Sequence, residues 1–212
     1  DKVLLLSKHG YKYMHKEFAF PKERMVINRL GTKVLTPARF STDTTLRIMS
    51  CSAVIGLKRV ELLAKAIKLL SIPVIWTHIG SGSLLGKVRT ETVVVPKNVE
   101  INLLGHVTPS DVHTYYSDKE VDLFINVSTS EGVSVAIMEA IAAGIPIMAT
   151  NVGGTPEIVN KKSGILISEN ISPAGLAAHI EEFAILPSNK KNMLKEGAIE
   201  VFKANYDSKK NA

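Results

Sequence analysis

Short apolar runs alternate with amphipathic stretches along most of the chain. Each run is bounded by polar residues, a pattern typical of buried strands in a parallel sheet. The runs occupy residues 46–52, 73–79, 99–104, 122–127, 146–149 and 164–168. Stretches with helical periodicity separate them, at residues 60–70, 83–95, 108–116, 133–143 and 173–186. The end of 83–95 has strand propensity, but its place in the alternation favours a helix. The pattern predicts a doubly wound, mainly parallel α/β sheet over residues 46–186.

The two ends of the chain flank this domain. Residues 2–7 and 25–30 have the pattern of short strands, with an amphipathic helix predicted between them at residues 8–18. Residues 32–45 are polar and lack periodicity, which is typical of a linker. Residues 187–212 predict a basic helix followed by a tail. The chain therefore divides into residues 1–45, the α/β domain, and a C-terminal extension.

The stretch from 122 to 149 is a strand, loop, helix and strand, the unit that places ligands beyond the carboxyl ends of parallel strands. Glu131 and Gly132 lie in its loop, and the helix is predicted to begin at Val133. The first N–H groups of a helix have no partner within it, so a phosphate fits there. We therefore expect an anionic ligand at this loop.

Glu139 is the one charged residue in the apolar helix of this unit. A carboxylate packed on several sides is costly unless hydrogen bonds satisfy it. The hydroxyls of a sugar could supply them, with Glu131 reaching another part of the same extended ligand. The alternative is a glutamate that pairs with a neighbouring lysine or lies at a domain edge.

Composition and charge narrow the classes of protein. The net charge is +6, but residues 40–187 carry 11 Lys and Arg against 14 acidic residues, so the predicted domain does not present the basic surface of a nucleic-acid reader. The single cysteine, Cys51, excludes an internal disulfide. No apolar stretch reaches the length of a membrane-spanning helix, so we expect a cytoplasmic protein.

Lysines on the helix at residues 8–18 raise the question of membrane contact. Lys8, Lys12 and Lys16 lie on one face, beside a face that carries Tyr11 and Phe18. A basic amphipathic helix can bind an anionic membrane, here the inner face of the cell membrane. A solvated lysine row is the commoner explanation, and we favour it.

The central segment resembles a known signature. Residues 131–159 read E-G-V-S-V-A-I-M-E-A-I-A-A-G-I-P-I-M-A-T-N-V-G-G-T-P-E-I-V, in which seven residues separate Glu131 from Glu139. This resembles the retaining glycosyltransferases of family 4, which have the GT-B fold of two Rossmann-like domains. The resemblance implies that Glu131 and the amides of Gly132 and Val133 contact the donor sugar and diphosphate, and that Glu139 binds the ribose.

The same resemblance assigns a phosphate contact to the loop after the first strand of the domain. Lys58 stands where the family has a lysine that meets the diphosphate, which makes Lys58 and Glu131 the expected catalytic pair. Ala53 stands where the family often has a polar residue, a departure that weakens the expected phosphate clamp. Arg59 is expected to be a surface neighbour.

Two further turns are implied to approach the nucleotide. Gly80 and Gly82 follow the second strand of the domain, and His106 and Val107 follow the third, where the family places the base. We expect His106 to be an exposed loop histidine rather than a catalytic base. The glycines of the segment 152–157 suit a tight turn, with Thr155 as the N-cap of a helix, and this loop is expected beside Glu131.

The implied reaction is transfer of a hexose-type sugar from a nucleoside-diphosphate sugar, such as a UDP- or GDP-sugar, to an acceptor glycan or lipid-linked sugar. Residues 1–45 then resemble the end of an N-terminal domain and an interdomain linker, with most of the acceptor-binding domain missing. We expect donor binding with little or no turnover by this chain alone. The chain has no Asp-x-Asp triplet, so neither a metal nor another cofactor is expected.

Two alternatives remain open. A nucleotide-sugar epimerase or phosphorylase on the same frame would share the strand–loop–helix unit, although the spacing of the two glutamates argues against it. A non-catalytic α/β module, such as a receiver domain, would need clustered acids after the first strand, and the segment after Cys51 has none. A dinucleotide-binding dehydrogenase would need a glycine fingerprint in that same place.

Overall fold

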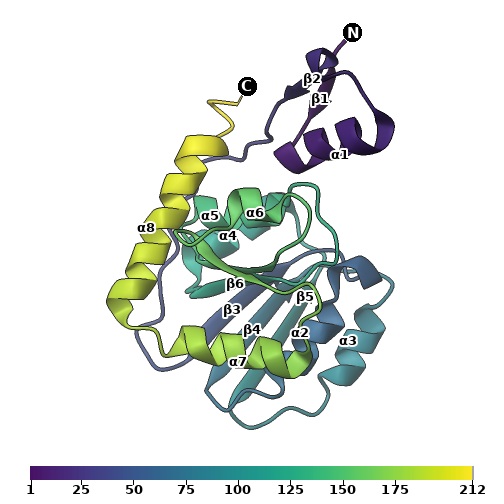
Figure 1. Ribbon diagram of the computed structural model, residues 1–212. Coiled ribbons are helices and arrows are strands. Elements are labelled where there is room, and N and C mark those ends of the chain that lie inside the picture. Colours follow the sequence, from purple (N-terminus) through teal and green to yellow (C-terminus); the bar gives the residue numbers. More distant parts are fainter. Residues whose placement is uncertain (212) are drawn as a thin grey trace.

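The predicted apolar runs form one parallel sheet. The computed structural model describes residues 1–211 (Figure 1). The strands of the sheet are β3 (Leu46–Cys51), β4 (Val74–Ile79), β5 (Val99–Gly105), β6 (Leu123–Asn126), β7 (Ile147–Thr150) and β8 (Gly164–Ile167). They lie in the order β5-β4-β3-β6-β7-β8, and all neighbouring pairs are parallel. The prediction of a doubly wound α/β sheet is confirmed.

The strand order reverses in the middle of the sheet. From β3 the chain adds β4 and β5 on one side, then returns to the other side of β3 and adds β6, β7 and β8. In open α/β sheets, ligands bind at this switch point, outside the carboxyl ends of the two central strands. The loops after β3 and β6 therefore flank the expected binding crevice.

Helices cover both faces of the sheet (Figure 1). On one face, α2 (Val60–Ile67), α3 (Leu85–Glu91) and α7 (Pro173–Ala184) bury an apolar layer that includes Trp76 and Phe183. The other face packs against α4 (Pro109–Asp118), α5 (Val135–Ala142), α6 (Thr155–Ile158) and α8 (Ser188–Asn205). Within β6, Leu123 and Ile125 join the first layer and Phe124 the second. Burial on both faces explains why the strands are continuously apolar.

Two helix starts differ from the predictions. Helix α5 begins at Val135 rather than Val133, because the hydroxyl of Ser134 accepts from the N–H of Ile137 and makes Ser134 the N-cap. Thr155 is the first residue of α6 and not its N-cap; Gly154 takes that position without a side-chain cap. Segment 83–95 is helical as predicted, although α3 is shorter than the predicted range.

The first residues form a small separate layer. Strands β1 (Val3–Leu5) and β2 (Met25–Ile27) pair in parallel, and α1 (Lys8–Phe18) connects them through a 3-10 turn at Lys22–Arg24. This unit lies above α5 and α6 in Figure 1, at the side of the molecule reached by the end of α8. No helix within residues 1–211 is long and apolar enough to cross a membrane.

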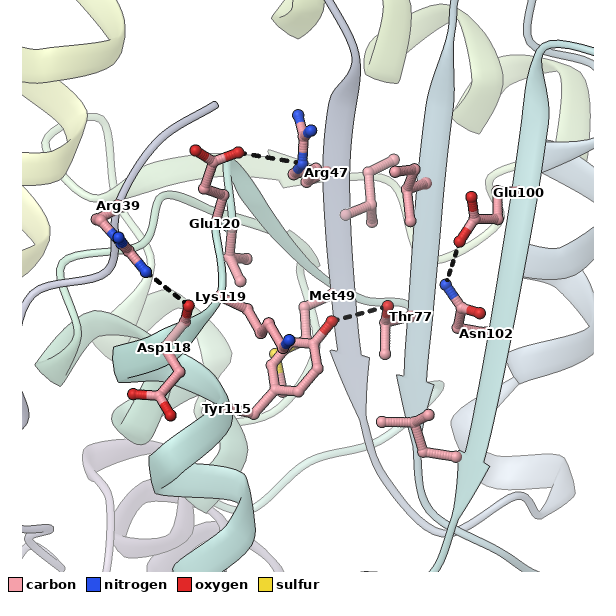
Figure 2. A pocket seen from close by; sticks show the side chains of 14 residues that line it. Arg39, Arg47, Met49, Thr77, Glu100, Asn102, Tyr115, Asp118, Lys119 and Glu120 are labelled. Atoms are coloured by element: carbon pink, nitrogen blue, oxygen red, sulfur yellow. Dashed lines mark hydrogen bonds and ion pairs between the residues drawn. The ribbon is translucent and has the colours of Figure 1, made fainter. Parts of the chain in front are cut away.

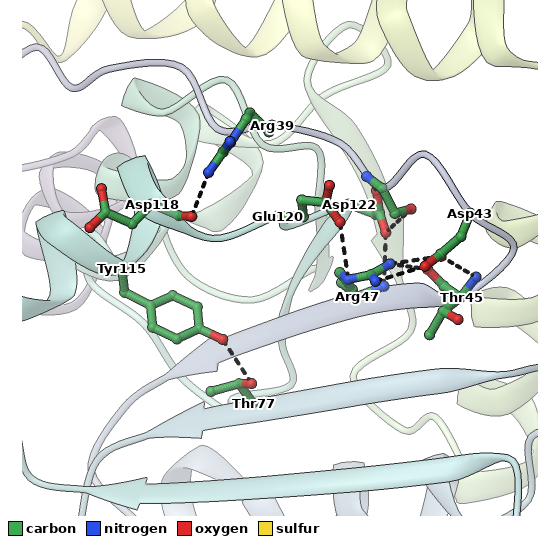
Figure 3. Close-up of polar contacts among 10 residues, drawn as sticks. Arg39, Asp43, Thr45, Arg47, Thr77, Tyr115, Asp118, Glu120 and Asp122 are labelled. Carbon is green, nitrogen blue, oxygen red and sulfur yellow. Dashed lines mark hydrogen bonds and ion pairs between the residues drawn. The ribbon is translucent and has the colours of Figure 1, made fainter.

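A buried carboxylate fastens the linker to the sheet (Figure 3). Asp122 accepts three hydrogen bonds of 2.8 Å, from the N–H and hydroxyl of Ser41 and from the N–H of Arg47. The Arg47 guanidinium also pairs with Asp43, which holds the pKa of that carboxyl below its usual range. These contacts fix the end of the linker at the amino end of β3, opposite to the edge where ligands are expected.

Candidate functional site at the switch point of the sheet

Two opposite charges meet where the strand order reverses. Lys58 ends a 3-10 turn (Gly56–Lys58) in the loop after β3, and Glu131 lies in the loop after β6. The Nζ atom of Lys58 is 2.6 Å from Oε1 of Glu131. That oxygen also accepts from the Ser128 hydroxyl at 2.7 Å and from the Asn126 amide at 3.2 Å. The structure thus brings the two predicted catalytic residues into direct contact.

Only a small crevice remains between the two central strands beside this ion pair. The crevice measures about 10 Å³ and is lined by Cys51, Lys58, Asn126 and Ser128, among others. A space of this size holds at most one water molecule. Glu131 has a side chain only 8% exposed, yet its Oε2 accepts no hydrogen bond from residues 1–211. The carboxylate therefore keeps acceptor capacity for a further donor group.

Backbone hydrogen bonds join the loops at the carboxyl edge of the sheet into one continuous rim. The joined pairs are Gly80 N with Gly105 O at 2.7 Å, Val54 N with Ser81 O at 2.9 Å, Thr129 N with Leu57 O at 2.9 Å, and Gly154 N with Glu131 O at 3.1 Å. The loops after β5, β4, β3, β6 and β7 are linked in this order, which follows the order of the strands. The predicted glycine turn, base turn, phosphate loop and sugar loop thus share one edge.

Two glycines of this rim combine a positive φ with a lack of room for a side chain. Gly80 has φ +141°, and a Cβ there would collide with the carbonyl oxygen of Ser52. Gly153 has φ +52°, and a Cβ there would collide with the carbonyl oxygen of Glu131. Both conformations disfavour residues with side chains. The close approach of these backbones explains the glycines, and it places the loop 152–157 beside Glu131 as predicted.

The remaining predicted residues lie on the same edge of the sheet. His106 is exposed, as expected, and Val107 packs partly against the core on the α4 side. Val133 is half-buried against the same core layer. A Cβ at Gly132 would meet nothing within 4 Å, so space does not require glycine there. Gly82 is exposed, but a Cβ there would collide with the backbone of Val54, so this position also requires glycine.

Glu139 lies at the corner formed by α5, α4 and the end of β3. Its Oε1 is 3.0 Å from Nε2 of His113, and the side chain of Glu139 is 15% exposed. Burial raises the pKa of the Cys51 thiol to about 11, and the nearby negative charge of Glu139 adds to the effect. Because Cys51 also lines the crevice, Glu139 and Lys58 lie on two sides of the same strand end. The partner of Glu139 is thus a histidine, and not the lysine considered from the sequence.

A buried polar network supports the end of β4 beneath Gly80. The Ser50 hydroxyl accepts from Nε1 of Trp76 at 2.9 Å and lies 2.8 Å from Nδ1 of His78. A hydroxyl can donate one hydrogen bond and accept two, so this contact suits either tautomer of a neutral imidazole. Burial lowers the pKa of His78 to about 4. The histidine is therefore a structural support and carries no charge at neutral pH.

A larger hollow lies elsewhere on the molecule (Figure 2). It measures about 560 Å³ on the face of β3, β4 and β5 beside α4. Its polar groups bond to one another: the Tyr115 hydroxyl lies 2.9 Å from that of Thr77, and the Asn102 amide donates to Glu100 at 2.8 Å. The residues that line it include none of those predicted for the site. The larger hollow is therefore not the site that the sequence predicts, although its volume far exceeds that of the charged crevice.

Sequence reasoning missed three partners of the two glutamates. Asn126 and Ser128 both bond to Glu131, and His113 bonds to Glu139. Asn126 and Ser128 are polar residues at the end of an otherwise apolar strand, a signal that could have drawn attention to them. His113 gave no such signal, because a helix face with mixed polar residues is ordinary.

A doubly wound domain with charged groups and glycine turns at its switch point has the Rossmann-like type of α/β fold. The sequence shows to which family this domain belongs. Residues 38–201 match the family model described as glycosyl transferases group 1. The chain belongs to the group 1 glycosyltransferases.

Individual relatives agree with this assignment. The putative colanic acid biosynthesis glycosyltransferase WcaL of Escherichia coli is 28% identical over 184 residues, which cover 80% of this chain and 44% of that protein. The amylovoran biosynthesis glycosyltransferase AmsK of Erwinia amylovora is 25% identical over 177 residues, which cover 76% and 43%. The chain thus spans less than half of the length of these relatives.

Solved structures share the fold. A glycosyltransferase from Rickettsia africae superimposes with a TM-score of 0.82 at 18% identity, covering 100% of this chain and 60% of that one. HepE from Anabaena, in complex with UDP and glucose, gives a TM-score of 0.81 at 17% identity, covering 99% and 60%. At this identity the likeness shows that the fold is the same, a GT-B-type Rossmann-like domain.

Proposed function

We propose that this chain binds the donor in a glycosyltransferase that moves a hexose-type sugar from a nucleoside-diphosphate sugar to an acceptor, with retention of configuration. The observation that carries the proposal is the pairing of Lys58 with Glu131 at the switch point of the sheet. A cation and a carboxylate beside a helix start provide one group for the diphosphate and one for the sugar.

The chemistry that these residues supply is electrostatic. Breaking the bond between sugar and diphosphate leaves negative charge on the departing nucleoside diphosphate, which Lys58 and the N-terminus of α5 would stabilise. Lys58 has to turn from Glu131 towards the diphosphate, since the two side chains are now bonded to each other beside the crevice. Released from the lysine, Glu131 would accept hydrogen bonds from the hydroxyls of the sugar.

The names of the relatives suggest which substrates to test. HepE was solved with UDP and glucose, and a 27% identical relative in Streptococcus agalactiae is named as a UDP-N-acetylglucosamine–peptide N-acetylglucosaminyltransferase subunit. UDP-sugars are therefore the first donors, with GDP-sugars second. WcaL and AmsK are named for polysaccharide biosynthesis, so we propose a glycan or lipid-linked sugar as the acceptor.

Isothermal titration of the chain with a panel of UDP- and GDP-sugars tests the proposal. We expect at least one donor to bind, and we expect EDTA to leave its affinity unchanged because the site is proposed to work without a metal. Glu139→Gln should weaken binding by about 1–3 kcal/mol through lost hydrogen bonds to the ribose. Glu181→Gln is the matched control, because that carboxylate bonds to Ser71 on an exposed surface. If no donor binds, or if Glu139→Gln has no effect, the proposed site is wrong.

A further inference from the structure

His113 is held in place from both directions along α4. Before it, Thr108 and Asp111 form a reciprocal capping box, with the Thr108 side chain accepting from the Asp111 N–H and the Asp111 carboxylate accepting from the Thr108 N–H. Around it, Val112 and Tyr116 are buried in the apolar layer on this face of the sheet. The imidazole therefore projects from a fixed helix, and its direction does not depend on a loop.

Glu139 is held by an equally rigid backbone. Its neighbours Met138 and Ala140 are fully buried in α5. The buried neighbours fix the backbone of Glu139 but not its side chain, and an unbonded glutamate side chain samples several rotamers. The 3.0 Å contact with Nε2 of His113 removes that freedom. An ionised carboxylate has no proton to give, so the histidine donates and the glutamate accepts.

The two carboxylate oxygens differ in their surroundings. Oε1 accepts from His113, whereas Oε2 makes no hydrogen bond to any of residues 1–211. Oε2 is also accessible to solvent. The side-chain atoms within residues 1–211 that are both fully buried and without a hydrogen bond do not include it. One oxygen is thus fixed by the protein and the other is available to a ligand.

We infer that His113 is a positioning residue for nucleotide binding: it holds Glu139 in the orientation in which its second oxygen meets the ribose hydroxyls. The inference rests on the proposed function, in which Glu139 contacts the ribose. Ordering a glutamate side chain on binding costs free energy, and a donor that orders it beforehand removes that cost from the binding step. Helix α4 starts directly after the turn at His106 and Val107, so His113 also ties the ribose contact to the turn where the base is expected.

The test compares UDP with 2′,3′-dideoxy-UDP, which lacks the ribose hydroxyls, by isothermal titration, with GDP and its dideoxy analogue in parallel. His113→Leu removes the donor while it keeps the bulk, and we expect it to weaken binding of the normal nucleotide about tenfold. Binding of the dideoxy analogue should not change, because that ligand makes no contact with Glu139 to be lost. This difference separates positioning from a general effect on the fold.

Two further variants keep the test independent of folding defects. His113→Gln places an N–H close to the position of Nε2 and should restore most of the affinity, whereas His113→Asn carries its N–H too near the backbone and should behave like His113→Leu. An equal loss for normal and dideoxy nucleotides, or no loss at all, would overturn the inference while the proposed function stands. If Glu139→Gln itself leaves nucleotide affinity unchanged, both the proposed function and the inference fall.

Discussion

The carboxylate of Glu157 accepts a hydrogen bond from the backbone N–H of His9, at 2.9 Å across 148 residues of sequence. It accepts a second hydrogen bond from the N–H of Lys8 at 3.1 Å, so a residue far away in the sequence caps the start of α1. Glu157 follows the loop whose Gly154 bonds to Glu131, and Gly154 also lies close to Ser7. One short segment therefore contacts both the proposed donor loop and the N-terminal unit.

Removing this cap should loosen α1 selectively. Glu157→Ala leaves the first N–H groups of α1 without an acceptor, which typically costs about 1 kcal/mol. We expect the amides of Lys8 and His9 to exchange with solvent about fivefold faster in hydrogen-exchange measurements, with no change in β3 or β6. Glu181→Ala is the control, since it removes a similar carboxylate from Ser71. Unchanged exchange in α1 would show that Glu157 does not hold the unit.

Because Lys58 and Glu131 form an ion pair, replacing either residue alone should lower the free energy of unfolding. Lys58→Met leaves a carboxylate that is 8% exposed without its cation, and we expect a loss of about 1–3 kcal/mol in the free energy of unfolding. Adding Glu131→Gln removes the unpaired charge and should recover part of that loss. Urea denaturation of the two single variants and the double variant measures the coupling.

The matched control is Lys162→Met. Lys162 lies 3.7 Å from Glu200, and both side chains are more than two-thirds exposed, at 73% and 68%. Exposed pairs contribute little to stability, so the midpoint of unfolding should not move. Losses at Lys58 and Glu131 that simply add would mean that the two charges do not depend on each other in solution.

The lowered pKa of His78 predicts that the protein loses stability in mild acid. The unfolded chain binds a proton on this histidine below its usual pKa of about 6.5, whereas the folded protein binds it only near the lowered pKa of about 4. Between these values the unfolded state holds more protons, so the free energy of unfolding falls as the pH is lowered from 6.5 to 4, by about 3 kcal/mol in all. The full contribution of His78 is present above pH 6.5.

Urea denaturation across this pH range, with His78→Gln for comparison, checks the effect. The variant lacks the titrating group, so its stability should depend less steeply on pH between 6.5 and 4. His179→Gln, which changes a histidine on α7 whose side chain is 39% exposed, should keep the slope of the unmodified protein. Equal slopes for His78→Gln and the unmodified protein would show that burial of this imidazole does not govern the acid response.

The elements of the fold were largely predictable because burial periodicity is a local property. All six apolar runs became strands, and the segment 83–95 contains the predicted helix at Leu85–Glu91, whereas its last residues, which have strand propensity, lie outside that helix. The errors lie at the starts and ends of helices, where single capping interactions and turns set the boundary. Ser134 caps α5 with its hydroxyl, and Gly154 is the N-cap of α6 without a side-chain hydrogen bond.

By itself, the sequence determined the alternation of strands and helices and the residues that follow each strand, including Lys58, Glu131 and the glycines of the rim. Only the tertiary structure decided which of these side chains meet. Lys58 contacts Glu131 across 73 residues, and His113 contacts Glu139 across 26. Such contacts depend on the order in which the strands are laid beside one another, and no local pattern of polar and apolar residues records that order.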